Sequence, residues 1–243
     1  MLKGKIALIS GANGGIGRSI VNLFLKEGAK VICLVRKKDR KFEEYLAKQK
    51  GKSVIIVSDI TNESMLKEEI RKVFTTIKKL DILINNAGMA HGSIIEMTSK
   101  KKLKEIFDTN FFSQIYLTQL VLKFLKKSKN PSIINIGSIS AKIPDKGTLA
   151  YGSSKLAFMH ATKIMANEFS NYNIRVNGIC PSATKTKMLK KMDSRAKEMF
   201  ISRSLLKKTC NPIDIANLIL FLSSNNSELI NGQVINIDGG LKW

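Results

Sequence analysis

The sequence predicts an α/β fold in which a doubly wound parallel sheet of about seven strands carries helices on both faces. Short β-branched runs alternate along the chain with longer segments of helical periodicity. The runs are apolar on both faces, as the strands of a covered parallel sheet are. A chain of 243 residues with 44% hydrophobic content can bury a large core, so we expect one domain over residues 1–243.

The elements are expected in alternating order. Strand patterns occupy 5–10, 30–35, 53–58, 81–85, 132–137, 174–180 and 233–237. The helices include 101–127 and 148–170, and a later one is expected to begin at Pro212. Gly28 suits the end of the first helix, because helices often close on a left-handed glycine. The irregular stretch 183–208 is rich in charges and methionines and is expected to be a mobile lid over the site.

Composition narrows the function classes. A formal net charge of +22 raises nucleic-acid binding as a hypothesis. The basic residues are mostly lysines spread through the polar segments, without interleaved aromatics for base stacking. We therefore expect no nucleic-acid partner and a solvated cationic surface that attracts anionic ligands and acidic proteins. No apolar run approaches the roughly 20 residues that span a bilayer, and the first residues resemble no targeting segment, so we expect a cytoplasmic protein without membrane association.

The cysteines and histidines predict neither a disulfide nor a metal site. Cys33, Cys180 and Cys210 are widely separated, and two of them lie in strand-like runs, where a thiol behaves as a small hydrophobe. His91 and His160 are too few to support a zinc site.

A glycine-rich turn follows the first strand and opens the first helix. Small residues there let the backbone approach a pyrophosphate, whose charge is stabilised by free N–H groups and the helix dipole. The spacing is G-x-x-x-G-x-G, and its place in a βαβ unit favours dinucleotide binding over a simple turn. The residues expected to contact the dinucleotide are Gly11, Asn13, Gly14, Gly15, Ile16 and Gly17.

The end of the second strand predicts NADPH as cofactor. An NAD-specific enzyme usually places an acidic residue there on the ribose hydroxyls, and no acid precedes Asp39. Arg36 stands where a guanidinium could pair with a 2′-phosphate, with Lys37 or Lys38 adding charge. The alternative is a solvent-facing basic loop.

Tyr151 and Lys155 are four residues apart in a helical segment and therefore share one face. A neighbouring ammonium favours the phenolate, and lowering the tyrosine pKa from near 10 to about 7 would take about 4 kcal/mol, within reach of a lysine together with a positive nicotinamide ring. Ser138 follows the fifth strand, at the edge where ligands bind in sheets of this kind. The three residues are expected to form a catalytic site.

With these motifs the chain resembles short-chain dehydrogenases/reductases, a Rossmann-type family, over essentially its whole length. The resemblance implies that Tyr151 is the general acid in reduction, Ser138 binds the substrate carbonyl and Lys155 holds the ribose hydroxyls. It implies that Asn110 orders a proton-relay water. It also implies cofactor contacts by Asp59, Ile60, Asn86, Ala87, Gly88, Pro181, Thr184 and Thr186.

Two alternatives and two departures accompany this resemblance. The segment 85–88 could be a simple turn, and Asn110 could be a structural residue that bonds backbone. Ser182 stands where the family usually has glycine, and this substitution is expected to stiffen the loop that leads to the lid. Asn13 and Gly14 lack the basic residue that NADPH users often carry, which leaves phosphate recognition to Arg36.

The substrate is expected to be a ketone. Motif placement and the closing segment 232–240 look most like the 3-oxoacyl-[acyl-carrier-protein] reductase group, and an acidic carrier protein would suit a cationic surface. The supporting lysines, expected near the mouth of the site, are Lys126, Lys127 and Lys129. Against this assignment, Tyr172 and Asn173 replace the Arg-Gly of many carrier-protein reductases.

Other substrates and another class stay open. A sugar, steroid, polyol or small ketone is the alternative, since the family combines one catalytic core with variable lids. The lid is expected to form an apolar, adaptable pocket with Met188, Leu189, Met192, Met199 and Phe200. A dinucleotide-binding or nucleic-acid-binding protein without turnover has no need for the aligned hydroxyl, phenol and ammonium. The resemblance further implies a homotetramer built on the helices 101–127 and 148–170.

Overall fold

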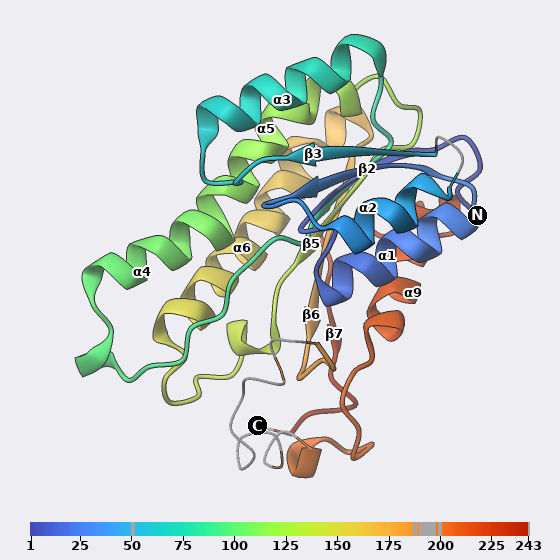
Figure 1. Cartoon of the computed structure of the whole chain (residues 1–243). Helices are drawn as coiled ribbons and strands as arrows, with labels where there is room; N and C mark the ends of the chain where they lie inside the picture. Colours follow the sequence, from blue (N-terminus) through green and yellow to red (C-terminus); the bar gives the residue numbers. More distant parts are fainter. Residues whose placement is uncertain (50–51, 187–188, 190–197, 199–200, 243) are drawn as a thin grey trace.

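The computed structural model describes residues 1–49, 52–186, 189, 198 and 201–242. At its centre is a parallel seven-stranded sheet in the order β3-β2-β1-β4-β5-β6-β7 (Figure 1). The strands are β1 (Ile6–Ser10), β2 (Lys30–Val35), β3 (Ser53–Val57), β4 (Ile82–Asn85), β5 (Ser132–Ile136), β6 (Arg175–Pro181) and β7 (Val234–Ile237). The expected fold class is confirmed, and each strand lies within a residue of its expected bounds.

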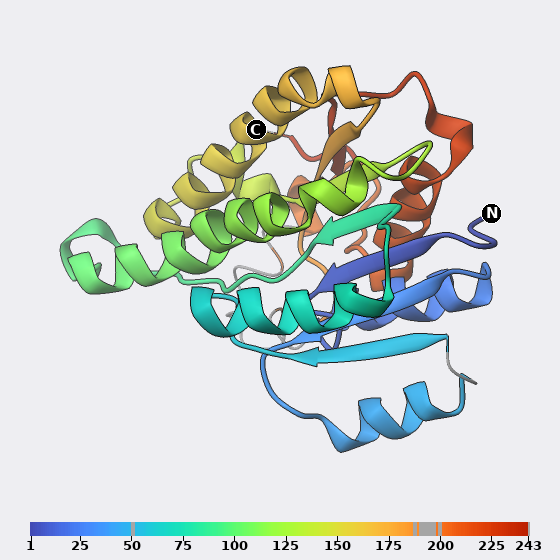
Figure 2. The same cartoon turned by 90° about the horizontal axis from the view of Figure 1, so that it is seen from above.

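Helices cover both faces of the sheet (Figure 2). The α-helices are α1 (Gly15–Lys26), α2 (Arg40–Ala47), α3 (Glu63–Thr76), α4 (Lys100–Phe107), α5 (Ser113–Leu125), α6 (Leu149–Glu168) and α9 (Pro212–Ser223). Shorter helical segments are η1 (Ile95–Met97), η2 (Asp108–Phe112), η3 (Ile139–Ala141), η4 (Ser170–Tyr172) and η5 (Asn225–Ser227). One face carries α1, α2 and α9, and the other carries α3, α5 and α6.

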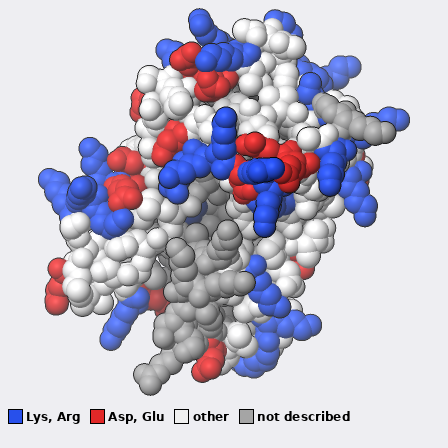
Figure 3. All heavy atoms as spheres, in the orientation of Figure 1, with Lys and Arg blue, Asp and Glu red and all other residues white. Residues whose placement is uncertain are grey.

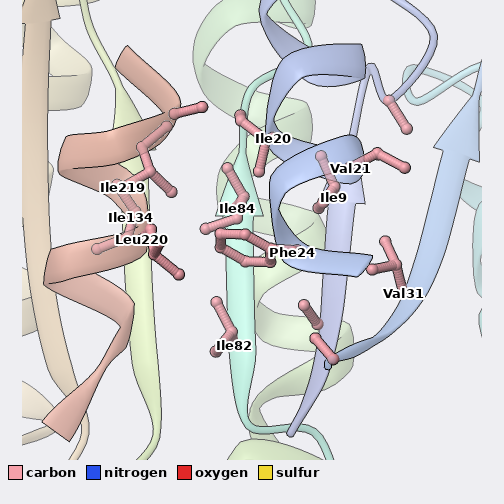
Figure 4. Close-up of a cluster of buried hydrophobic side chains, with 14 of the residues drawn as sticks. Ile9, Ile20, Val21, Phe24, Val31, Ile82, Ile84, Ile134, Ile219 and Leu220 are labelled. Atoms are coloured by element: carbon pink, nitrogen blue, oxygen red, sulfur yellow. The ribbon is translucent and has the colours of Figure 1, made fainter. Parts of the chain in front are cut away.

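Alternating side chains of each strand feed the two cores. In β1, Ala7 and Ile9 point into the core under α1 and α9, whereas Leu8 points into the core under α3, α5 and α6. Phe24 of α1 is fully buried over the sheet (Figure 4). Truncation of such a residue to alanine typically costs about 3–5 kcal/mol, so this packing fixes α1, and with it the turn that precedes α1, on the sheet.

Helix boundaries follow local signals in three places. Gly28, with φ of 90°, lies just beyond α1, as expected. The helix expected at 148–170 is α6. The helix expected from Pro212 is α9, and its first turn is closed by the Asn211 backbone N–H, which donates to Asp214 Oδ2 at 2.8 Å.

The helix expected over 101–127 is present as one helical run from Lys100 to Leu125, with a π-turn in its middle. The segment is α4, a turn of π-helix at η2, and α5. A π-turn inserts a residue into the helical ladder and is frequent at functional sites. Asn110 lies in this turn.

Part of the expected lid at 183–208 lies outside the described residues, including Met188, Met192, Met199 and Phe200. The chain is described again from Ile201, and Ser204 pairs there with Leu241 in an antiparallel bridge. None of the described helices has both the length and the apolar character needed to cross a membrane.

Candidate active site and dinucleotide-binding turn

The glycine-rich turn lies where the strand order of the sheet reverses. β1 is flanked by β2 on one side and β4 on the other, and a crevice for ligands forms at the carboxyl ends of such strands. Gly11 has φ of 63°, and a Cβ on it would lie 3.0 Å from the Ala87 Cα. A Cβ on Gly17 would lie 2.2 Å from the Gly11 carbonyl oxygen. The turn therefore has the compact backbone that close approach of a pyrophosphate needs.

Residues after β4 brace this turn. Asn86 Nδ2 donates to the carbonyl oxygens of Ser10 and Gly11 at 2.9 and 3.1 Å. Ser10 Oγ in return accepts the backbone N–H groups of Asn86 and Ala87, both at 2.9 Å. Gln114 Nε2 reaches over from α5 to the Ala87 carbonyl at 2.8 Å. The segment 85–88 is thus more than a simple turn, because it joins the ends of two strands at the crevice.

Ser10 and Gln114 were not among the expected site residues. Both are fully buried polar side chains, and Ser10 Oγ also donates to Gln114 Oε1 at 3.3 Å. The available signal was a serine that ends an otherwise apolar strand directly before the glycine turn.

The loop after β6 closes over the same turn. Pro181 is the last residue of β6, and Thr184 is buried beyond it. Thr186 Cγ2 is 2.7 Å from the position that a Cβ on Gly15 would take. Two expected cofactor segments, far apart in sequence, therefore meet at the first turn of α1.

Ser182 ties this loop to the last strand. Its backbone N–H donates to the Ile237 carbonyl at 2.9 Å, and its Oγ lies 3.5 Å from Cys210 Sγ. Cys210 Sγ itself contacts the Ile237 carbonyl at 3.0 Å. The effect of Ser182 on the stiffness of the loop stays a prediction, because the bond to Ile237 is made by the backbone N–H.

Charged groups gather at the ends of β2 and β3. Arg36 is exposed directly after β2, and Asp59 follows β3. The pKa of Asp59 is lowered, chiefly by the Thr61 backbone N–H that bonds its Oδ1 at 3.0 Å, and also by the Arg36 charge. Ile60 is buried beside it. Arg36 and Asp59 therefore follow neighbouring strands of the sheet, and the charge of one acts on the other.

Ser138, Tyr151 and Lys155 come together at the carboxyl edge of the sheet. Ser138 is 8% exposed and begins the short helix after β5, where its Oγ accepts the Ser140 N–H at 3.2 Å. A hydrogen bond links the side chains of Ser138 and Tyr151. Lys155, one turn further along α6, is 4% exposed, and its Nζ donates to the Ile136 carbonyl at 2.7 Å.

The expected lowering of the tyrosine pKa depends on Lys155 together with a bound nicotinamide ring, and the chain by itself has the opposite shift. Burial raises the pKa of Tyr151, and the hydrogen bond with Ser138 offsets this only in part. Burial also lowers the pKa of Lys155 from 10.5 to about 8. The lysine is directed at the Ile136 carbonyl, so the phenol stays protonated at neutral pH, which is the form that can donate a proton.

Asn110 is fully buried, and its side chain forms hydrogen bonds with other groups of the protein. Its Oδ1 accepts the Met89 N–H at 2.8 Å, and its Nδ2 donates to the Met89 carbonyl and to Ser154 Oγ, each at 3.0 Å. Gly88 lies close by, since a Cβ on it would be 3.1 Å from Asn110 Oδ1 and 3.3 Å from Lys155 Nζ. The side chain of Asn110 therefore bonds backbone groups, as the alternative of a structural residue predicts. These bonds hold the segment 87–89 beside Lys155.

The side chains that follow Ser138 form an apolar cluster. Its members are Ile139, Ile143 and Leu241, and all three are buried. Two neighbouring loops contact the segment 143–148. The Ser93 N–H of one loop donates to the Gly147 carbonyl, and Arg203 of the other forms an ion pair with Asp145. These loops carry exposed apolar side chains, namely Ile94, Ile95, Met97, Leu205 and Leu206.

The three lysines expected near the mouth of the site lie elsewhere in the subunit. Lys126, Lys127 and Lys129 fall between the end of α5 and the start of β5, whereas Ser138 follows the end of β5. Because strands of a parallel sheet begin at one edge and end at the other, these lysines occupy the opposite edge. Tyr172 is there too, with Lys126 Nζ 3.5 Å from its ring centroid.

Basic side chains are spread over the face shown in Figure 3 and are interrupted by acidic groups. They do not gather there into one continuous stripe. The three cysteines are free and buried. Among the residues that the structure describes, no group of three or more His, Cys, Asp or Glu side chains is placed to hold a metal ion.

Comparisons with known proteins agree with this geometry. A family model described as Enoyl-(Acyl carrier protein) reductase matches residues 11–242. The 3-oxoacyl-[acyl-carrier-protein] reductase FabG of Thermotoga maritima is 34% identical over 99% of this chain and 98% of its own length.

Two solved structures share the fold. A 7 alpha-hydroxysteroid dehydrogenase complexed with NADH and 7-oxo glycochenodeoxycholic acid superposes with a TM-score of 0.93 at 31% identity, covering 99% of this chain and 95% of that one. ElxO with NADP bound superposes with a TM-score of 0.89 at 28% identity, covering 97% of each chain.

Proposed function

Because the chain belongs to the short-chain dehydrogenase/reductase family of oxidoreductases, we propose that it is an NADPH-dependent reductase that converts a ketone to an alcohol. The observation that carries the proposal is the Ser138–Tyr151 hydrogen bond with Lys155 one helical turn away, at the sheet edge that also holds the glycine turn. A hydroxyl, a phenol and an ammonium in that order suit proton delivery to a carbonyl oxygen.

The glycine turn fits a dinucleotide. Its glycines leave a cradle that side chains would fill, and the N-terminus of α1 presents free N–H groups without an acidic residue in its first turn. Thr184 and Thr186 would contact the cofactor from the loop after β6. When bound, NADPH supplies the hydride, and the residues of the chain position it and manage the proton.

Tyr151 is proposed as the proton donor. Burial keeps its hydroxyl protonated at neutral pH, and Ser138 holds the hydroxyl and the substrate carbonyl in one place. Lys155 would turn from the Ile136 carbonyl to the ribose hydroxyls. Asn110 would fix the segment 87–89 behind the lysine, and a relay water beside it stays part of the proposal.

Arg36 supports NADPH over NADH. It is exposed at the end of β2, where a guanidinium can pair bidentately with a 2′-phosphate, and the Asp59 carboxyl beside it could meet the adenine amino group. ElxO is an NADP-bound relative, whereas the similar hydroxysteroid dehydrogenase structure holds NADH. The positive charge of Arg36 therefore supports NADPH as the cofactor of this chain.

The proposed substrate is a 3-oxoacyl group carried on an acyl-carrier protein. The similarity to the Thermotoga maritima reductase over the full chain supports it, as does the positive net charge, which suits an acidic carrier. The exposed apolar side chains of the neighbouring loops, among them Ile95, Met97 and Leu206, would contact the acyl chain. The same apolar surface favours a steroid-like ketone as the second candidate, in keeping with the hydroxysteroid dehydrogenase neighbour.

A homotetramer in the cytoplasm completes the proposal. The outer face of α5 and α6 forms a groove whose lining includes Phe112 and Ile164, and these side chains are 56% and 46% exposed in the single chain. Large apolar side chains exposed in a contiguous patch often mark a protein interface. A second copy of the same helices would cover this face by two-fold symmetry.

A spectrophotometric screen tests the substrate. NADPH oxidation is followed at equal enzyme concentration with acetoacetyl-acyl-carrier protein, a small acetoacetyl thioester and a 7-oxo steroid. An aldohexose is tested in the reverse direction, by following the reduction of NADP⁺. The highest kcat/KM is expected with the carrier-bound substrate, with a clear loss for the free thioester. Turnover of the steroid alone would transfer the assignment to the second candidate, and no oxidation with any ketone would overturn the reductase proposal.

A further inference from the structure

Two sulfur atoms lie beside the backbone that leads into Ser138. One belongs to Cys180 of β6 and the other to Met159 of α6, and both side chains are buried. A Cβ on Gly137, the residue before Ser138, would lie 3.0 Å from Cys180 Sγ and 2.7 Å from Met159 Sδ. The sulfur atoms therefore occupy the space that a side chain at position 137 would fill.

The thiol of Cys180 extends the pairing of β5 with β6 by one hydrogen bond. Just beyond β5, the Gly137 N–H donates to the Ile179 carbonyl at 2.8 Å. The next N–H along the chain is that of Ser138, and it donates to the Cys180 sulfur. Ser138 is thus held at its backbone by the thiol and at its side chain by the hydrogen bond with Tyr151.

The chemistry of this thiol favours a role as hydrogen-bond acceptor over a role as nucleophile. Burial raises the pKa of Cys180, although the charges of Lys142 and Lys155 act in the opposite direction. The thiol is therefore neutral at pH 7, and a buried neutral thiol is inert. Its sulfur can still accept a weak hydrogen bond from an N–H group.

We propose that Cys180 is a positioning residue, whose sulfur fixes the Ser138 backbone so that the serine hydroxyl meets both Tyr151 and the substrate carbonyl. This inference rests on the proposed role of Ser138 in ketone reduction and adds to it a residue that does not touch the substrate. Ser138 has an extended backbone, with φ of −165° and ψ of 154°, and the direction of its Oγ follows the orientation of that backbone. Small displacements of an aligned catalytic group lower the rate, because the reacting atoms leave their productive geometry.

Three substitutions separate hydrogen bonding from packing. Cys180→Ser keeps an acceptor, Cys180→Val fills the space of the thiol without an acceptor, and Cys180→Ala has neither property. If the hydrogen bond positions Ser138, the serine variant should resemble the wild type and the valine variant should resemble the alanine variant. If the thiol only packs in the hydrophobic core, valine should replace it best and serine should be the poorer substitute.

The experiment measures kcat and KM with NADPH and a small acetoacetyl thioester, and Kd for NADPH by fluorescence titration of the full-length protein. We expect Cys180→Val and Cys180→Ala to lower kcat by about five- to tenfold, the effect of losing one hydrogen bond. The Kd for NADPH should stay within about twofold, because the thiol does not face the glycine turn. The kcat of Cys180→Ser should lie within about twofold of the wild type.

A second background tests whether the effect acts through Ser138. In the Ser138→Ala protein, assayed at higher enzyme concentration, Cys180→Val should change the remaining kcat by less than about twofold. Cys33→Val is the matched control, because Cys33 is also a fully buried thiol of a strand but lies in β2, and kcat should stay within about twofold. Thermal melting shows whether each variant is folded.

The outcomes separate this inference from the proposed function. A Cys180→Val protein with the kcat of the wild type, a Cys180→Ser protein as impaired as Cys180→Val, or an equal loss in both backgrounds would overturn the inference alone. A Ser138→Ala protein with the kcat of the wild type would instead overturn the proposed role of Ser138 and, with it, this inference.

Discussion

Replacement of Lys155 by methionine should stabilise the protein while it removes activity. Burial lowers the pKa of Lys155 from 10.5 to about 8. At neutral pH the charged lysine therefore destabilises the folded state by about 3 kcal/mol relative to the unfolded chain. Methionine of similar length carries no charge. It leaves the Ile136 carbonyl without its donor, an offset of about 1 kcal/mol, so the free energy of unfolding at pH 7 should rise by about 2 kcal/mol.

The pH dependence gives the sign of the effect. Below pH 8 the lysine is protonated in both the folded and the unfolded chain, and the full penalty is present. Between pH 8 and 10.5 the unfolded chain holds a proton that the folded lysine has lost, so the stability of the wild type rises with pH relative to the variant. The advantage of Lys155→Met should therefore be largest at pH 7, should vanish near pH 10, where the remaining penalty equals the lost hydrogen bond, and should reverse above that pH.

The assay is urea denaturation of both proteins at fixed protein concentration from pH 6.5 to 10.5. Lys67→Met serves as the matched control, because Lys67 is an exposed lysine of α3 and its loss should change the free energy of unfolding by less than about 0.5 kcal/mol. A Lys155→Met protein that is less stable than the wild type at pH 7, or a difference between the two that does not change with pH, would refute the reasoning.

Three further predictions concern the site and the assembly. The kcat/KM for NADPH should fall about tenfold per pH unit above pH 8 as free Lys155 loses its proton, and a flat profile to pH 9.5 would contradict this. Asn110→Ala should lower the free energy of unfolding by about 2–3 kcal/mol in urea denaturation, because Met89 loses both backbone partners, and an unchanged midpoint would argue against the contact. The double variant Phe112→Glu with Ile164→Glu should have a lower mass by light scattering than the wild type. An unchanged mass would contradict the proposal that the α5–α6 face is an interface.

Much of the fold followed from the sequence, for a physical reason. The apolar runs of β1 and β2 bury both faces of each strand, so their positions are strongly constrained by composition alone. Gly11 and Gly17 marked the turn because a Cβ at either position would strike neighbouring backbone. Ser138, Tyr151 and Lys155 could be placed together because a helix and a parallel sheet fix which side chains share an edge.

Contacts between segments that are distant in the sequence could not be predicted from local patterns. Asn110 in the π-turn bonds Met89 from a distant loop, and Ser10 bonds Gln114 from another helix. The pKa of Tyr151 depends on burial, which periodicity does not reveal. Lys126 was expected near the mouth from charge alone, whereas the direction of β5 places it at the other edge.

The most direct test of the account is the kcat of Tyr151→Phe at saturating NADPH and ketone, measured alongside the Kd for NADPH. The variant keeps the ring and loses the hydroxyl that bonds Ser138. The account predicts that kcat falls by about 10²–10⁴-fold while Kd stays within about threefold, because the hydroxyl donates the proton and does not hold the phosphates. A kcat within tenfold of the wild type would contradict the central claim.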